Sequence, residues 1–261
     1  MALTANSDIR GKMRRLIYYG ILSMTRYSLF LWLSLTYYSQ PGFAFSVDSL
    51  FKVDGENSRF FVLKNPEHDP IYLAITLSEL QRKAGGGYHE VPFIAAEFLN
   101  WPLYIDPSDV VVDAEGEVRV SVMRANSVPE YDRIIGVSFI PDALRQQQEQ
   151  PDSNVAISIG YKSWYIIPGS LPIKGEPTAW LSDGKIHFNN QSSRVLRFEM
   201  DLCQGVSEEK AKALCYGESI LLPGNQKIID VPLGANVRQG RITFSALSGN
   251  YKKAITLQST R

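Results

Sequence analysis

Residues 154–168 read NVAISIGYKSWYIIP, and the first half of this stretch has the period of a β-strand. Three β-branched residues alternate there with three small ones: Val155, Ile157 and Ile159 with Ala156, Ser158 and Gly160. An apolar row on a strand either fills the core of its own domain or is presented at a sheet edge for another chain to cover. The stretch alone leaves both interpretations open.

The residues before this stretch have the pattern of short strands separated by turns. Ile71, Leu73, Ile75 and Leu77 alternate with more polar neighbours, as a half-buried strand requires. Counting residues 154–168, seven strands are predicted over about 120 residues, which is typical of an immunoglobulin-like sandwich. The others are residues 46–53, 59–64, 71–77, 103–112 with a break at Asp106-Pro107, 118–122 and 134–140. Residues 82–101 are irregular and glycine-rich, so we expect a surface excursion and no helix of note.

A second unit is predicted after residue 167. Residues 168–172 read PGSLP, which cannot continue a strand. Strand patterns then return at residues 185–188, 195–202, 220–222, 228–231, 241–247 and 254–257. The chain is therefore predicted to be all-β, with an N-terminal immunoglobulin-like domain at residues 45–167 and a C-terminal β-sandwich domain at residues 168–261.

The first 44 residues have the order of a signal peptide. Basic residues precede an apolar run at residues 27–38, which is short for a membrane span. Gly42 and Ala44 then offer the small residues that a signal peptidase accepts, so we expect cleavage after Ala44. Met24 is an alternative start, because Met24-Thr25-Arg26 also makes a short basic beginning. An uncleaved membrane anchor is the competing interpretation.

The composition gives no support for an enzyme or a nucleic-acid-binding protein. Lysine plus arginine and aspartate plus glutamate both number 27, so no net charge attracts nucleic acid. The three histidines, His68, His89 and His187, are scattered and have no metal-ligand spacing, which argues against a copper–zinc dismutase. There is no phosphate-binding glycine loop and no Gly-x-Ser-x-Gly turn. We expect no catalytic residues, no metal and no cofactor.

The two cysteines, Cys203 and Cys215, are predicted to form a disulfide. An even pair in an exported protein is most simply a structural bridge, since export leads to an oxidising compartment. The Cys-x-x-Cys spacing of a redox pair is absent. Closing a loop of this size contributes about 3 kcal/mol to stability.

Several local motifs then resemble the periplasmic chaperones of chaperone–usher pili. Three match strands of the first domain: residues 101–107 (WPLYIDP) with Gly116 and Val118-Arg119-Val120, residues 130–141 (EYDRIIGVSFIP), and residues 154–168. A fourth, Leu222-Pro223-Gly224, is similar to a motif of the family's second domain. Asn100-Trp101-Pro102 and Leu171-Pro172 are most similar to the branch that serves class 5 (alpha) fimbriae.

This resemblance implies a fold and a function. It implies two immunoglobulin-like domains in an L-shaped tandem, located in the periplasm. It also implies donor-strand complementation, in which Val155, Ile157 and Ile159 enter the open groove of a fimbrial (pilin) subunit. The subunit is then delivered to an outer-membrane usher. The exposed strand leaves room for a self-capping dimer or oligomer in the free protein.

The family also holds the terminal carboxylate of the subunit between two basic residues. The matching positions here are Lys52 and Lys162, which together are expected to make charge-assisted hydrogen bonds. The sequence departs from the family at the domain junction, because Ile166-Ile167 stand where an arginine usually pairs with an acidic residue matching Glu130. The usual interdomain salt bridge is therefore not expected, and apolar contacts are the alternative.

A fimbrial subunit, or another surface adhesin with an immunoglobulin-like fold, is the alternative function. Such a subunit has one domain without its last strand and an amino-terminal donor extension. This chain instead has a full set of predicted strands followed by a second unit.

Overall fold

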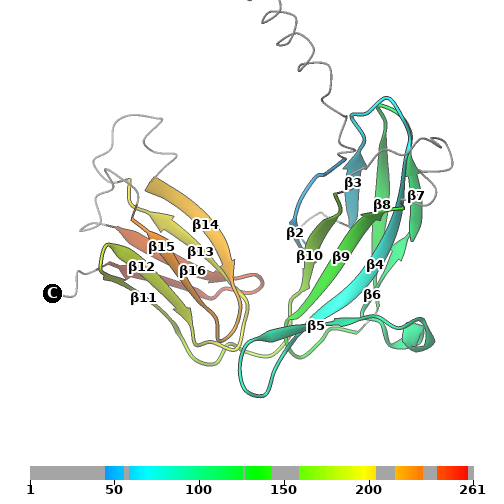
Figure 1. Ribbon diagram of the computed structural model, residues 1–261. Helices are drawn as coiled ribbons and strands as arrows, with labels where there is room; N and C mark the ends of the chain where they lie inside the picture. Colours follow the sequence, from blue (N-terminus) through cyan, green and yellow to red (C-terminus); the bar gives the residue numbers. More distant parts are fainter. Residues whose placement is uncertain are drawn as a thin grey trace, which may run out of the picture. The chain divides into compact units, whose positions relative to one another are not determined.

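The computed structural model describes residues 45–55, 59–125, 127–142, 159–203, 215–231 and 240–257 (Figure 1). Apart from turns and one 3-10 helix, these residues form β-strands, so the prediction of an all-β chain is confirmed. Within these ranges no helix has the length and apolar character needed to span a membrane.

The first sandwich pairs two sheets. In one, the order is β1 (Ser46–Val47), β3 (Phe60–Lys64), β8 (Glu117–Arg124) and β6 (Leu103–Asp106). In the other, the order is β2 (Phe51–Val53), β10 (Tyr161–Ile167), β9 (Arg133–Pro141), β4 (Ile71–Arg82) and β5 (Tyr88–Pro92), while β7 (Asp109–Val112) also pairs with β4. This is the strand order of an immunoglobulin-like sandwich, as predicted.

The core between these sheets follows the alternation seen in the sequence. Ile71, Leu73, Ile75 and Leu77 of β4 all point inward and are buried. Their partners include Val137 and Phe139 of β9, and from the facing sheet Phe61 and Val120. Phe45, the first described residue, is also buried there and meets the ring of Tyr161 edge-on at 5.0 Å.

The prediction of one continuous strand at residues 46–53 is wrong. β1 pairs with β3 of one sheet, and β2 pairs in parallel with β10 of the other. Between them the chain turns at Ser49, whose hydroxyl hydrogen-bonds to the backbone of Phe51. The sequence pattern does not show the break because Val47, Phe51 and Val53 keep the spacing of a single strand. In the structure, Val47 packs on the core between the sheets and Phe51 packs on the other face of its own sheet.

Residues 82–101 are more regular than expected. β4 extends to Arg82, and β5 returns beside it with Leu80 opposite Glu90. A 3-10 helix, η2 (Ala95–Asn100), follows β5 and has no buried residue. The glycines that suggested an irregular segment lie in the turn between β4 and β5.

The second sandwich is smaller. One sheet has the order β11 (Pro177–Ser182), β12 (Lys185–Asn190) and β15 (Gln226–Asp230). The other has the order β14 (Tyr216–Leu221), β13 (Leu196–Asp201), β16 (Arg241–Ala246) and β17 (Lys252–Thr256). Phe188, Phe198 and Phe244 form the centre of its core, with ring centroids of Phe188 and Phe198 4.2 Å apart. A disulfide joins Cys203 and Cys215 beside this core.

Candidate functional site

The edge of β10 is the feature on which the candidate site is built. β2 pairs only with Trp164, Tyr165 and Ile166 of β10, and is visibly the shorter strand (Figure 1). Ahead of Trp164, no strand of the described residues pairs with β10 on this side, so Tyr161–Ser163 form an open sheet edge. Such an edge is a template for pairing with another chain.

The predicted donor residues lead into this edge. Val155 and Ile157 lie outside the described residues. Ile159 is 52% exposed, and both Ile159 and Gly160 precede the first residue of β10. The exposure of Ile159 is what the donor interpretation requires of a side chain awaiting a partner.

Lys162 lies on the outer face of the sheet, away from the core. Tyr161 and Tyr165 point inward, whereas Lys162, Trp164 and Ile166 alternate with them and point outward. The Lys162 ammonium forms an ion pair with Glu90 of β5 and lies 5.8 Å from the centroid of the Trp164 ring. Lys162 therefore already has a carboxylate partner within its own chain.

Glu90 accepts two hydrogen bonds through the same oxygen. One comes from Lys162 and the other from the Ser78 hydroxyl, at 2.5 Å. The hydrogen bond from Lys162 holds the pKa of Glu90 below its ordinary value, and the bond from Ser78 acts in the same direction. The carboxylate is thus kept ionised by the groups that bind it.

Gly136 of β9 makes room for this arrangement. A Cβ atom at this position would lie 2.7 Å from the Ser78 hydroxyl oxygen, 3.2 Å from the Trp164 ring and 3.4 Å from Cδ of Lys162. Only glycine therefore lets the Lys162 side chain lie across β9 toward Glu90 without moving its neighbours.

Lys52 has a different position. It pairs with Tyr165 in the parallel register, and so lies on the inward face of the sheet. Its ammonium contacts Asp48 Oδ2 at 2.6 Å and the Phe60 carbonyl oxygen at 2.8 Å, and lies 5.0 Å from the Phe61 ring centroid. Lys52 is 8% exposed. The structure therefore does not bring the two predicted anchor lysines together: they lie on opposite faces of one sheet, each paired with a carboxylate of its own chain.

These surroundings predict different effects for the two lysines. Lys52→Met should lower the free energy of unfolding by about 1–3 kcal/mol, because it leaves the Phe60 carbonyl and the Asp48 carboxylate without their donor. Lys162→Met should change it by less than about 1 kcal/mol, since an exposed ion pair contributes little. Urea unfolding of both variants measures the difference. Equal stabilities would show that Lys52 is hydrated in solution.

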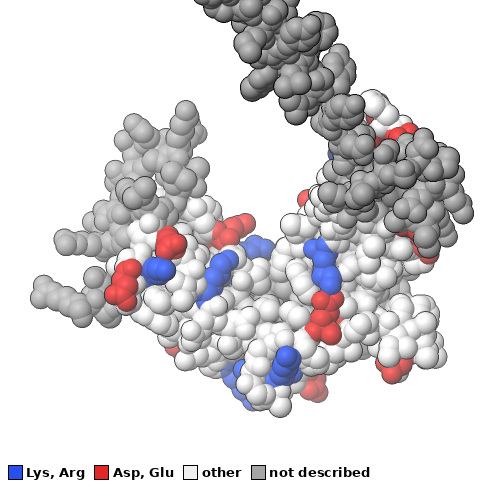
Figure 2. All heavy atoms as spheres, in the orientation of Figure 1, with Lys and Arg blue, Asp and Glu red and all other residues white. Residues whose placement is uncertain are grey.

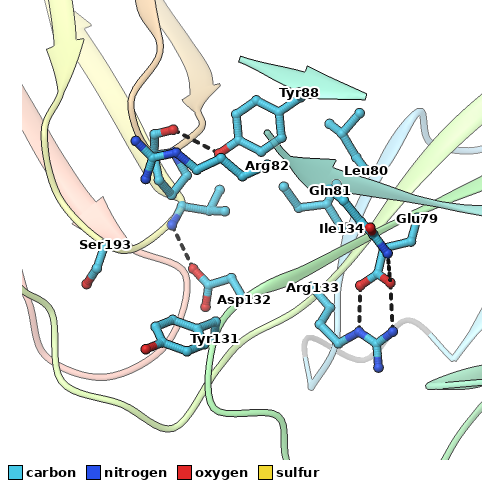
Figure 3. Close-up of a pocket in the computed structure, with 12 residues that line it drawn as sticks. Glu79, Leu80, Gln81, Arg82, Tyr88, Tyr131, Asp132, Arg133, Ile134 and Ser193 are labelled. Carbon is cyan, nitrogen blue, oxygen red and sulfur yellow. Dashed lines mark hydrogen bonds and ion pairs between the residues drawn. The ribbon is translucent and has the colours of Figure 1, made fainter. Parts of the chain in front are cut away.

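A buried ion pair links the two sandwiches, contrary to expectation. Asp132, just before β9, accepts hydrogen bonds from Arg194 Nε at 2.8 Å and from the backbone N–H of Val195 at 2.6 Å, the latter drawn in Figure 3. The two side chains are only 3% and 8% exposed. The Asp132 carboxylate also accepts from the Gly169 N–H. Asp132, and not the exposed Glu130, is the acidic partner, and its arginine comes from the second sandwich.

Arg194 uses its remaining donors in the same region. Nη1 donates to the Leu171 carbonyl at 2.8 Å, and Nη2 donates to the Ser248 hydroxyl at 3.0 Å. A small apolar cluster lies beside this network and includes Ile134 and Ile166 from the first sandwich and Val195 from the second. The expected apolar contacts are therefore present, in addition to the ion pair.

A cavity of about 530 Å³ opens next to this junction. Its lining includes Leu80, Arg82, Tyr88, Tyr131, Arg133 and Val195 (Figure 3). Most of its polar groups are already engaged, since Arg133 makes a bidentate pair with Glu79 and the Tyr88 hydroxyl donates to the Pro223 carbonyl. The cavity therefore offers few polar groups to a ligand.

The surface charges are dispersed. Figure 2 shows small basic and acidic areas separated by uncharged surface on the face drawn. In the part of the chain that the structure describes, no three histidine, cysteine or acidic side chains are grouped as metal ligands. The edge of β10 and the two lysines thus remain the candidate site.

Comparison with known proteins finds a family model that matches the first sandwich. Residues 47–168 match the family model of the CS5 fimbrial protein N-terminal domain. The relationship to fimbrial assembly proteins predicted from the sequence motifs is thereby confirmed. The matched residues include β10 and its edge, as well as both lysines.

Relatives of the chain extend beyond this domain. An uncharacterised 25.9 kDa Escherichia coli protein from the CS5 3′ region is 28% identical over 214 residues, covering 81% of this chain and 91% of the relative. Among solved structures, the class 5 fimbriae chaperone CfaA is 11% identical, with a TM-score of 0.45 and coverage of 83% of this chain and 100% of that one. A structure of Salmonella enterica SafA pilin with the SafB chaperone is 12% identical, with a TM-score of 0.45 and coverage of 84% and 99%.

Proposed function

We propose that this protein is a periplasmic chaperone that binds fimbrial subunits by donating the strand ahead of β10, and passes them to an outer-membrane usher. The single observation that supports this most is the open edge of β10 within the CS5 fimbrial domain, next to the exposed side chain of Ile159. The function involves binding and release, with no chemical step.

The donated strand supplies two kinds of interaction. Backbone groups at the edge of β10 form hydrogen bonds with an incoming strand whatever its sequence. Val155, Ile157 and Ile159 then fill the apolar groove of a subunit that lacks its own last strand. Burying each such side chain contributes roughly 1.5–3 kcal/mol before the entropic cost of ordering is subtracted.

Lys162 and Lys52 are proposed to hold the terminal carboxylate of the subunit. Their roles differ, because Lys162 is 35% exposed whereas Lys52 is 8% exposed and enclosed by Asp48 and Phe60. Lys162 is the cation that an incoming chain reaches directly. Lys52 contributes once its contact with Asp48 opens.

Export is part of the proposal. Residues 1–44 act as a signal peptide, with Met24 as the alternative start, and the mature chain begins at Phe45. The burial of the Phe45 side chain in the core supports a mature chain that includes this residue. The working division into domains is residues 45–167 and 168–261, the second carrying the disulfide.

The alternative function, a fimbrial subunit or adhesin, fits the structure less well. A subunit that accepts a donor strand lacks the last strand of its own sandwich. Here that strand is present as β10, with its pairing to β9 complete from Tyr161 to Ile167.

Subunit capture tests the proposal. The tagged protein is co-expressed with a CS5-type fimbrial subunit, and the subunit is measured after affinity purification. Lys162→Met should reduce capture more than tenfold, because a carboxylate left without its partner costs roughly 2–5 kcal/mol. Lys64→Met is the matched control. Lys64 forms an exposed ion pair with Glu117, and both residues lie in the sheet that does not contain β10. Capture by none of the proteins, wild type included, would refute the chaperone function.

A further inference from the structure

The ion pair of Lys162 with Glu90 points away from the edge at which a partner would bind. In the sheet order β2-β10-β9-β4-β5, the open edge of β10 lies on the β2 side, whereas Glu90 lies on β5 at the other end. The Lys162 side chain therefore lies across β9, and the Glu90 side chain extends from β5 to meet it beside Ser78 of β4. It cannot contact Glu90 and a carboxylate at the open edge at the same time.

Three neighbouring residues support the ion pair of Lys162 with Glu90. Gly136 leaves space for the lysine stem, Ser78 donates to the carboxylate oxygen that Lys162 binds, and the Trp164 ring flanks the ammonium. These groups come from three different strands. They distinguish the pair from exposed ion pairs such as Lys64 with Glu117, whose side chains are 61% and 53% exposed.

The pair is nevertheless open to competition. The side chains of Lys162 and Glu90 are 35% and 37% exposed, so another carboxylate can approach the ammonium from solvent. Exposed pairs of this kind exchange partners at little cost, because their net contribution is about 1 kcal/mol or less. Lys52, which is enclosed, lacks this accessibility.

We propose that Glu90 is an internal competitor for the anchor: it holds Lys162 away from the open edge until the α-carboxylate of a bound chain replaces it. This inference rests on the proposed function and adds a determinant of ligand choice. A partner with a free carboxyl end keeps the Lys162 charge paired throughout the exchange. A strand without a chain end at this position must leave Lys162 on Glu90 and gains nothing from it. Glu90 thus weakens the binding of true chain ends and leaves the binding of internal strands unchanged.

Binding of synthetic peptides tests this inference. The peptides have the sequence of the C-terminal strand of a CS5-type fimbrial subunit, and each is made as the free acid and as the C-terminal amide. Glu90→Gln should bind the free acid about two- to fivefold more tightly than wild type, the factor that corresponds to an exposed ion pair. It should bind the amide with unchanged affinity. In a Lys162→Met background, the same substitution should have no effect on either peptide.

Three outcomes would overturn the inference. An unchanged affinity of Glu90→Gln for the free acid shows that Glu90 does not compete with the ligand. The chaperone function still stands in that case if wild type binds the free acid and Lys162→Met does not. A gain that persists in the Lys162→Met background shows general charge repulsion instead of competition. No binding of either peptide by wild type refutes the chaperone function as well. Glu117→Gln, which removes the partner of Lys64, is the matched control and should match wild type.

Discussion

Asp132→Ala is expected to lower the free energy of unfolding by about 3–5 kcal/mol, the cost of removing one partner from a buried ion pair. The substitution leaves the Arg194 guanidinium without its carboxylate, and the N–H groups of Gly169 and Val195 without their acceptor. Denaturant unfolding followed by tryptophan fluorescence measures the effect, since Trp164 packs against the apolar cluster beside this pair.

Two controls accompany this measurement. Glu117→Ala breaks an exposed pair with Lys64 and should cost less than about 1 kcal/mol. Asp132→Asn keeps a hydrogen-bond acceptor at the same position. Its loss of unfolding free energy should lie between those of Asp132→Ala and Glu117→Ala. If Asp132→Ala unfolds at the same denaturant concentration as Glu117→Ala, the junction between the sandwiches is hydrated in solution and the pair does not hold it.

Ile159→Asp is expected to weaken subunit capture about 100-fold or more while leaving the free protein as stable as wild type. In the free protein the side chain is 52% exposed, so an added carboxylate stays hydrated. In a subunit groove it would be buried without a partner, which costs several kcal/mol. Capture is measured by co-purification, and stability by thermal unfolding.

Ile228→Asp is the matched control for this substitution. Ile228 is 55% exposed on β15 of the second sandwich, far along the chain from the proposed donor strand. Its replacement should affect neither stability nor capture. A large drop in the melting temperature of Ile159→Asp, with capture retained, would identify residues 154–160 as a core strand and exclude the donor role.

Much of the fold could be predicted from the sequence because the alternation of apolar and polar residues within a strand is a local pattern. The alternation at Ile71–Leu77 and at Val118–Val122 reports which side chains face the core, and the structure buries those of β4 as expected. β11 was missed because most of its side chains are only half-buried, so its residues show no clean alternation. The division of residues 46–53 between two sheets was also missed, since Val47, Phe51 and Val53 keep the spacing of a single strand although they pack on different faces.

The candidate site was less predictable because its contacts are not local. Asp132 and Arg194 are 62 residues apart in the sequence, and no spacing rule relates them. The pairing of Lys162 with Glu90 depends equally on how β5 returns beside β4. Sequence similarity to a family suggested the two lysines as anchors, but it could not show that each is already paired with a carboxylate of its own chain.

The short strand β2 limits the length of any strand that is added to β10. The backbone N–H of Trp164 donates to the Leu50 carbonyl, and the Ile166 carbonyl accepts from Asp54, so these groups of the edge are already used. A strand that pairs with β10 from Ile159 toward Trp164 must therefore end at Ser163 or turn away from the sheet. On the proposed function, a partner strand with further residues would have to displace Phe51, which already pairs with Trp164.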